Sequence, residues 1–134
     1  MYHTEEYSCV EPGERAKTIL VVEDDEDIGM LLVRAISLAT TYKAMLVADG
    51  FQALEAVRRL KPNLFLLDYH LPSMNGIELY DRLHTVEGLE HVPAIMISAS
   101  LPTDELQKRK LIGMNKPLKL RELFHTIETL LISR

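Results

Sequence analysis

The segment ILVVEDDEDI, residues 19–28, decides the fold of this chain. Four apolar residues run directly into five consecutive acids, which occupy positions 23–27. An apolar run without polar alternation is typical of a strand that is covered on both faces, as in a parallel sheet. Five adjacent carboxylates repel one another, and burying one of them without a partner is costly. The acids therefore either face water at the start of a helix or surround a cation.

The composition is that of one globular domain. At 134 residues, of which 47% are hydrophobic, the chain can bury a core without disulfides. A net charge of −5 argues against nucleic-acid binding, and the basic residues 108–110 are interpreted as a solvated helix face. No apolar run approaches a membrane span, and a single cysteine, Cys9, fits a reducing cytoplasm. We expect a flexible polar tail over residues 1–16 and one domain over residues 17–134.

Short apolar runs alternate with segments of helical periodicity along the rest of the chain. The runs are Thr18–Val22, Ala44–Val47, Asn63–Leu67, Ala94–Ile97 and Leu111–Met114. The first helical stripe consists of Ile28, Leu31, Leu32, Ala35, Ile36 and Ala39. Further stripes begin at Phe51, Ile77 and Leu120, whereas the segment 103–110 has Leu106 as its only apolar residue. Five strand–helix repeats predict an α/β fold, a doubly wound parallel sheet with helices on both faces.

Polar residues follow the predicted strands where such sheets bind ligands, beyond the carboxyl ends of the strands. Glu23 and Asp24 follow the first strand, Asp68 the third, Ser98 the fourth and Lys116 the fifth. Carboxylates gathered in this way suit Mg²⁺, which prefers oxygen ligands. A carboxylate can also attack phosphorus and form an aspartyl phosphate. Residues 25–27 are expected in the first turn of a helix, where negative charge is favourable.

Four motifs in this order resemble the receiver domain of bacterial two-component response regulators. They are ILVVEDD (19–25), LFLLDYHLPSMNG (64–76), ISAS (97–100) and NKP (115–117). The resemblance covers the chain from Lys17 to the C-terminus. It implies a flavodoxin-like sheet of five parallel strands in the order 2-1-3-4-5.

The resemblance also implies a role for each residue at the strand ends. Asp68 would accept a phosphoryl group from the histidine of a sensor kinase. Asp24 and Asp68 would ligate Mg²⁺ directly, together with the backbone carbonyl of His70, and Glu23 would act through a metal-bound water. Ser98 would bond the phosphoryl oxygens and Lys116 would neutralise them. Pro117 would follow a cis peptide bond.

Two departures from the family pattern fall in one region. Ser98 and Lys116 are 18 positions apart (116 − 98), which is about one helical turn, 3.6 residues, shorter than is usual in the family. We therefore predict a shortened fourth helix. The family often carries an aromatic residue three positions before the lysine, but here that position is Gly113.

Three functions are considered. Because no output domain follows the last predicted helix, the leading hypothesis is a stand-alone phosphoacceptor. It would phosphorylate and slowly dephosphorylate itself rather than turn over a separate substrate, with a sensor kinase or phosphotransfer protein and an unknown downstream protein as partners. A receiver-like interaction module that no longer cycles phosphate is the second. A phosphatase of the haloacid dehalogenase type is the third, but it needs a second acid two positions after its nucleophile, where this chain has His70.

Overall fold

The computed structural model describes residues 16–132, which form a single α/β unit. The strands are β1 (Thr18–Val22), β2 (Lys43–Val47), β3 (Leu64–Asp68), β4 (Ala94–Ser98) and β5 (Ile112–Asn115). The helices are α1 (Glu26–Ala39), α2 (Gly50–Ala56), α3 (Gly76–Leu83), α4 (Thr103–Arg109) and α5 (Leu120–Ile132). Strands and helices alternate throughout, as the sequence pattern predicted.

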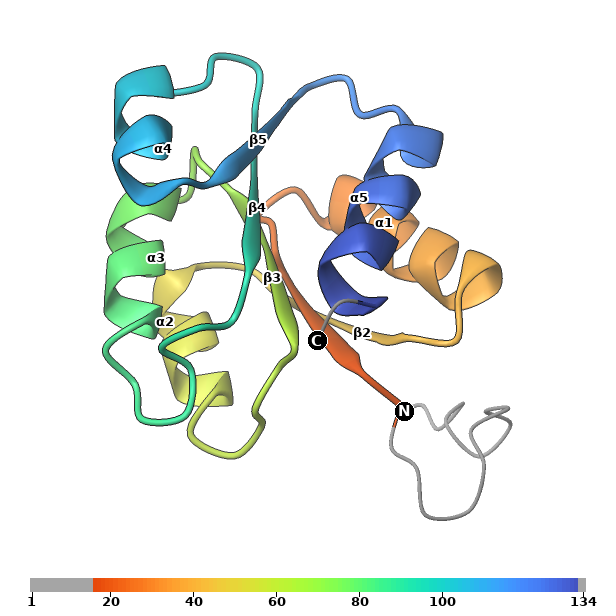
Figure 1. The fold of residues 1–134 in the computed structure, drawn as a ribbon, viewed down its shortest axis with the longest axis horizontal. Helices are drawn as coiled ribbons and strands as arrows, with labels where there is room; N and C mark the ends of the chain where they lie inside the picture. Colours follow the sequence, from red (N-terminus) through yellow and green to blue (C-terminus); the bar gives the residue numbers. More distant parts are fainter. Residues whose placement is uncertain (1–15, 133–134) are drawn as a thin grey trace.

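The five strands form one parallel sheet in the order β2-β1-β3-β4-β5. β1 pairs with both β2 and β3, so β2 is added on one side of β1 and the later strands are added on the other side. Helices α1 and α5 cover one face of the sheet and α2, α3 and α4 cover the other (Figure 1). The predicted doubly wound fold and its strand order are therefore confirmed, and the carboxyl ends of β1 and β3 lie next to each other.

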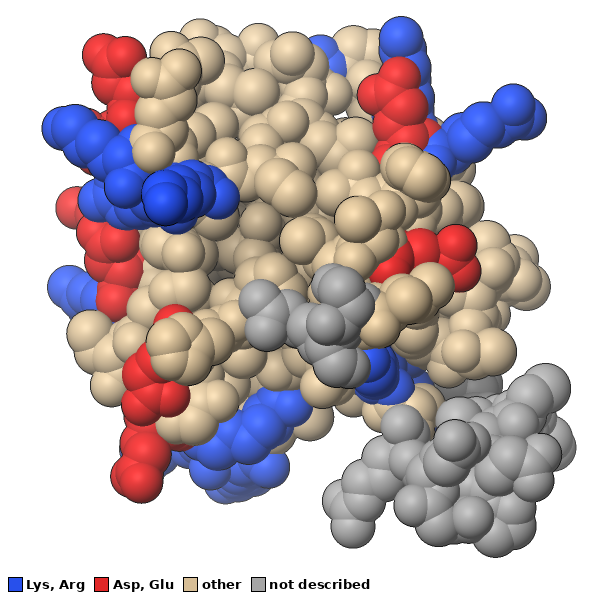
Figure 2. All heavy atoms as spheres, viewed as in Figure 1, with Lys and Arg blue, Asp and Glu red and all other residues tan. Residues whose placement is uncertain are grey.

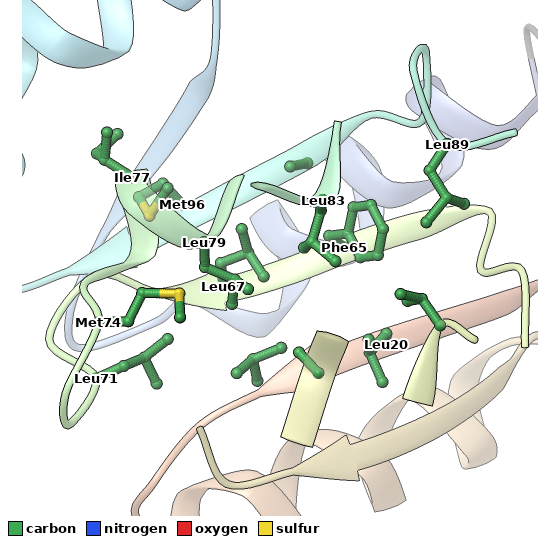
Figure 3. Packing of buried hydrophobic residues seen from close by; sticks show 14 of the residues in the cluster. Leu20, Phe65, Leu67, Leu71, Met74, Ile77, Leu79, Leu83, Leu89 and Met96 are labelled. Carbon is green, nitrogen blue, oxygen red and sulfur yellow. The ribbon is translucent and has the colours of Figure 1, made fainter. Parts of the chain in front are cut away.

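Side chains of the central strands alternate between two cores, one on each face of the sheet. Leu20, Val22, Phe65 and Leu67 pack under α2 and α3 in the larger cluster (Figure 3). Their neighbours in sequence, including Ile19 and Leu66, pack under α1 and α5 in the second cluster. Residues 19–22 are at most 1% exposed, as expected for a strand covered on both sides. Full burial of a side chain of this size contributes about 1.5–3 kcal/mol. The buried strands therefore hold their alignment in the sheet, and with it the positions of the residues that follow them.

Some predicted details are wrong. Leu31 and Phe51 fit the predicted apolar stripes, but they are 58% and 56% exposed. Leu32, which also belongs to the predicted stripe, is buried as expected, and Ala53, which does not, is buried instead of Phe51, because each helix turns a slightly different face to the sheet. β3 and β5 each begin one residue later than the predicted runs.

The segment with one apolar residue does form a helix. α4 is seven residues long and is held to the core by Leu106, which is only 6% exposed. Apart from Ala16, the predicted tail, including Cys9, lies outside the described residues. Within residues 16–132, no helix is long and apolar enough to cross a membrane.

Candidate functional site

The buried acids Glu23 and Asp68 meet Lys116 at the carboxyl end of the sheet. The Lys116 ammonium donates a hydrogen bond to Asp68 Oδ2 at 3.2 Å and lies 3.5 Å from Glu23 Oε1. Glu23 and Asp68 are 3% and 4% exposed, although β1 and β3 bring them to the rim of the sheet. Two buried carboxylates therefore share a single ammonium, which leaves the cluster with an excess of negative charge.

Asp24 completes a group of three carboxylates. One oxygen each from Glu23, Asp24 and Asp68 lies within 4.8 Å of the other two. Mg²⁺ holds oxygen ligands at about 2.0–2.1 Å in octahedral geometry, which places two ligand oxygens about 3–4 Å apart. Glu23 Oε1 is buried without a hydrogen-bond partner, and Asp24 is exposed. The residues present thus fit a small divalent cation.

The remaining acids of the run start α1. Asp25 is the N-cap, and its Oδ1 accepts a hydrogen bond from Ile28 N at 3.1 Å. Glu26 and Asp27 are exposed in the first turn, where the partial positive charge of the helix favours them. The Asp25 N–H also donates to Glu23 Oε2 at 3.1 Å. The run is therefore divided as expected: two acids at the crevice, and three at the start of the helix.

The loop after β3 positions the Asp68 carboxylate from its other side. The backbone N–H of His70 donates to Asp68 Oδ1 at 3.0 Å, and the His70 side chain is exposed. Gly76 closes this loop, since its N–H donates to Tyr69 O at 2.9 Å. A Cβ at Gly76 would lie 2.7 Å from the Asp68 carbonyl oxygen, so only glycine allows this approach. The loop thereby fixes Oδ1 of Asp68, while Lys116 binds Oδ2.

Ser98 lies at the end of β4, one residue beyond Ile97, the register partner of Asp68. Its side chain is fully buried. The hydroxyl donates to the Ser100 carbonyl oxygen at 2.9 Å and accepts from the Ser100 N–H at 3.0 Å. The structure thus places Ser98 beside the site but turns its hydroxyl toward its own loop. The Lys116–Pro117 peptide bond is cis, as expected.

The electrostatics of the site raise two pKa values. Burial, with a smaller contribution from the Asp68 carboxylate, raises the pKa of Glu23 to about 7 against the opposing Asp25 N–H and Lys116 ammonium. Partial burial acts to lower the pKa of Lys116, but the hydrogen bond to Asp68 and the charges of both acids raise it overall. Burial makes the ionised carboxylate of Glu23 unfavourable. A cation bound beside Glu23 in place of a proton would stabilise the negative charge.

Two contacts near the site were not found from the sequence. Leu101 and Leu106 lie against the backbone of Gly113, where a family member often has an aromatic side chain. Arg109, interpreted as part of a solvated face, forms a bidentate ion pair with Asp81 of α3, both bonds at 2.8 Å. The glycine at position 113 indicates that other side chains must fill the space beside β5. Which side chains do so depends on the path of the chain after Ser98, and the sequence does not specify that path.

A doubly wound sheet of this order, with acids, a hydroxyl and a lysine gathered at the carboxyl ends of its strands, is the arrangement expected of a receiver domain. The family described as "Response regulator receiver domain" matches residues 19–128. This chain therefore belongs to the receiver domain family of response regulators.

Relatives and solved structures agree with this assignment. The polar-differentiation response regulator DivK of Brucella anthropi is 29% identical over 119 residues, covering 86% of this chain and 96% of DivK. A CheY-like receiver domain protein of Methanospirillum hungatei has a TM-score of 0.81 at 24% identity, covering 89% of this chain and 96% of that one. The receiver domain of the sensor histidine kinase PA1611 of Pseudomonas aeruginosa, solved with magnesium in its active-site cleft, has a TM-score of 0.75 at 25% identity, covering 87% and 98%.

Proposed function

We propose that this chain is a Mg²⁺-dependent phosphoacceptor that takes a phosphoryl group onto Asp68 from a sensor histidine kinase or a phosphotransfer protein. The observation that carries the proposal is the setting of Asp68. Its buried carboxylate is held by the Lys116 ammonium and the His70 N–H, within reach of two further acids. Membership of the receiver domain family supports the same role.

The residues of the site have separable tasks in the transfer. An oxygen of Asp68 attacks phosphorus, and the bond from phosphorus to the histidine nitrogen breaks, with its electron pair remaining on the imidazole. Lys116, already 3.2 Å from Asp68 Oδ2, neutralises charge on the phosphoryl oxygens. The Ser98 hydroxyl donates a hydrogen bond to one of those oxygens, for which it must turn away from Ser100.

Asp24 and Asp68 would hold Mg²⁺ directly with the His70 carbonyl, and Glu23 would act through a bound water. When bound, the ion supplies positive charge that offsets the repulsion between carboxylates and phosphoryl oxygens. Glu23 Oε1 supports this assignment, since it is buried and accepts no hydrogen bond, with only the Lys116 ammonium 3.5 Å away. Magnesium in the cleft of the PA1611 receiver domain supports it from a relative of the same fold.

The output of the phosphorylated chain would be a protein–protein interaction. Receiver domains are typically signalling modules rather than enzymes that turn over a separate substrate, so self-phosphorylation and slow self-dephosphorylation would be the only chemistry. The DivK relatives are described as response regulators, which supports signalling as the output. The cytoplasm, where sensor kinases present their phosphohistidine, is the proposed location.

Labelling with a small phosphodonor tests the proposal without knowledge of the kinase. Wild type incubated with acetyl phosphate and Mg²⁺ should gain one acid-stable, hydroxylamine-labile phosphoryl group. Asp68→Asn should gain none, because an amide oxygen is a much weaker nucleophile. The matched control is Asp49→Asn, at the start of α2, where asparagine still caps the helix. An unlabelled wild type would overturn the proposal in favour of an interaction module, and equal labelling of Asp68→Asn would show another acceptor.

A further inference from the structure

The loop between β3 and α3, residues 69–75, holds the Asp68 carboxylate but is hydrogen-bonded to the sheet at its first residue. There the Tyr69 N–H donates to Ile97 O of β4 at 2.8 Å. Within the described part of the chain, the hydrogen bonds of residues 70–75 run to residues 68–79, which are the loop itself and the start of α3. Side-chain packing must therefore hold the tip of the loop against the rest of the fold.

The charged side chains of the neighbouring helices pair with one another instead of with this loop. Arg109 of α4 binds Asp81 of α3 and Glu105. Acidic and basic side chains lie side by side along the outer flank of these helices (Figure 2). Residues 70–75 include no Asp, Glu, Lys or Arg. The packing that holds the loop tip is therefore apolar.

Met74 provides the apolar anchor of the loop. Its side chain is only 4% exposed and belongs to the larger core cluster (Figure 3). It rests on the backbone of Gly50, the first residue of α2. A Cβ at Gly50 would lie 2.9 Å from Met74 Sδ and 3.3 Å from Met74 Cε. Any side chain at position 50 would therefore displace Met74, and the glycine allows α2 and the loop to touch directly.

The residue before the anchor, Ser73, has a φ of 70°. Residues other than glycine rarely adopt this left-handed conformation, and they keep it only where the surrounding structure enforces it. The Ser73 side chain is exposed, so it gains no burial in return. The buried side chain of Met74 follows directly, so the packing of Met74 on Gly50 is what maintains this turn.

We infer that Met74 is a positioning residue through which the first turn of α2 sets the geometry of the Asp68 site. The inference rests on the proposed function, since its consequences are felt in Mg²⁺ binding and phosphorylation. Contact with Gly50 fixes the loop, and the loop holds the His70 N–H 3.0 Å from Asp68 Oδ1. The same placement fixes the His70 carbonyl that would hold the metal. α2 contributes no residue to the group of three carboxylates, yet it controls how that group is completed.

Met74→Ala tests the inference by three measurements on the whole chain. In the metal-free protein, amide hydrogen exchange at residues 70–74 should become roughly tenfold faster, because the loop tip loses its anchor. Mg²⁺ should bind roughly tenfold more weakly by calorimetry, because a ligand loses its support. Labelling by acetyl phosphate at saturating Mg²⁺ should slow roughly tenfold, because Asp68 is misplaced. Met74→Leu preserves the volume and should stay within about twofold of wild type in all three.

Leu89→Ala is the matched control for lost packing. Leu89 is fully buried at the opposite end of the same cluster (Figure 3). Its truncation should lower the stability against urea at least as much as Met74→Ala does. The Mg²⁺ affinity and labelling rate of the folded protein should nevertheless stay within about twofold of wild type, because the loop keeps its anchor.

Gly50→Ala approaches the same contact from α2. The new methyl displaces Met74, so Mg²⁺ should bind roughly threefold more weakly. In the Met74→Ala background the methyl meets no side chain, and the same change should have no further effect.

Ser73→Val tests the anchor without altering the core, because the side chain at this position is exposed. A β-branched residue disfavours a φ of 70°, so the turn should relax and Met74 should leave Gly50. The expected loss of Mg²⁺ affinity is roughly tenfold, as for Met74→Ala. Ser73→Gly, which adopts this φ freely, should bind Mg²⁺ as wild type does.

The outcomes separate the role of Met74 from the function on which it rests. Wild-type Mg²⁺ affinity in folded Met74→Ala or in Ser73→Val would overturn the positioning role and leave Asp68 as phosphoacceptor. An equal loss of affinity in Leu89→Ala would also overturn it. A wild type that neither binds Mg²⁺ nor becomes labelled would overturn the proposed function, and with it the role of Met74. Losses in Met74→Ala and Ser73→Val that spare Leu89→Ala would support the inference.

Discussion

The buried carboxylate of Glu23 should make the stability of the metal-free protein fall as the pH rises. Its pKa is raised from 4.5 to about 7, mainly by burial. Between these values the folded protein holds a proton that the unfolded chain has lost, so the free energy of unfolding decreases with increasing pH. At about 1.4 kcal/mol per pKa unit, the rise corresponds to about 3 kcal/mol, fully expressed above pH 7.

Glu23→Gln should remove this penalty, because glutamine has the same shape and no charge. The raised pKa already includes the attraction of Lys116 at 3.5 Å, so we expect a net gain in the free energy of unfolding of about 3 kcal/mol at pH 8. At pH 5 Glu23 is protonated in the folded protein and most of the pH-dependent penalty is absent, so the variant and wild type should agree within about 1 kcal/mol.

Urea denaturation followed by circular dichroism, in the presence of a chelator, measures both values. Glu122→Gln is the control, since that side chain is 64% exposed and should change the stability little at either pH. Mg²⁺ at 100 times its dissociation constant should raise the free energy of unfolding of wild type by about 2.7 kcal/mol. A difference between Glu23→Gln and wild type that is the same at pH 5 and pH 8 would refute the reasoning.

Three further predictions concern the other ion pairs and ligands. Asp24→Ala should weaken Mg²⁺ binding roughly tenfold by calorimetry, since a carboxylate is lost; unchanged affinity would show that Asp24 is no ligand. Lys116→Met should lower the free energy of unfolding at pH 8 by about 2 kcal/mol, because Asp68 loses its partner; a stabilised variant would contradict this. Asp81→Asn should lower the free energy of unfolding by about 1 kcal/mol, because it breaks the bidentate pair with Arg109. The control Lys108→Ala should lower it by less than about 0.5 kcal/mol, and an equal decrease in both variants would exclude a special role for the Arg109 pair.

The sheet was predictable because its central strands are encoded by uninterrupted apolar runs. Residues 19–22 and 64–67 have no polar alternation, which only a strand covered on both faces explains well. The site followed from the same pattern, since the carboxyl ends of neighbouring parallel strands share one edge. Placing Glu23, Asp68 and Lys116 together needed no knowledge of side-chain contacts.

The details that were missed depend on packing rather than on pattern. In α1, Leu31 and Leu32 are adjacent apolar residues, and only the fit against the sheet decides that Leu32 is buried. The contacts of Gly113 depend on the path of the loop after Ser98, which no periodicity specifies. The hydrogen bonds of the Ser98 hydroxyl were likewise not readable from residue types.

The most direct test of the central claim is to locate the phosphoryl group. Wild type phosphorylated by acetyl phosphate with Mg²⁺ would be reduced with borohydride, which converts an aspartyl phosphate to homoserine, and then digested and sequenced by mass spectrometry. We predict homoserine at position 68 in the presence of Mg²⁺ and unmodified aspartate there in the presence of a chelator. Homoserine at Asp24 or any other acid, with Asp68 unmodified, would contradict the account.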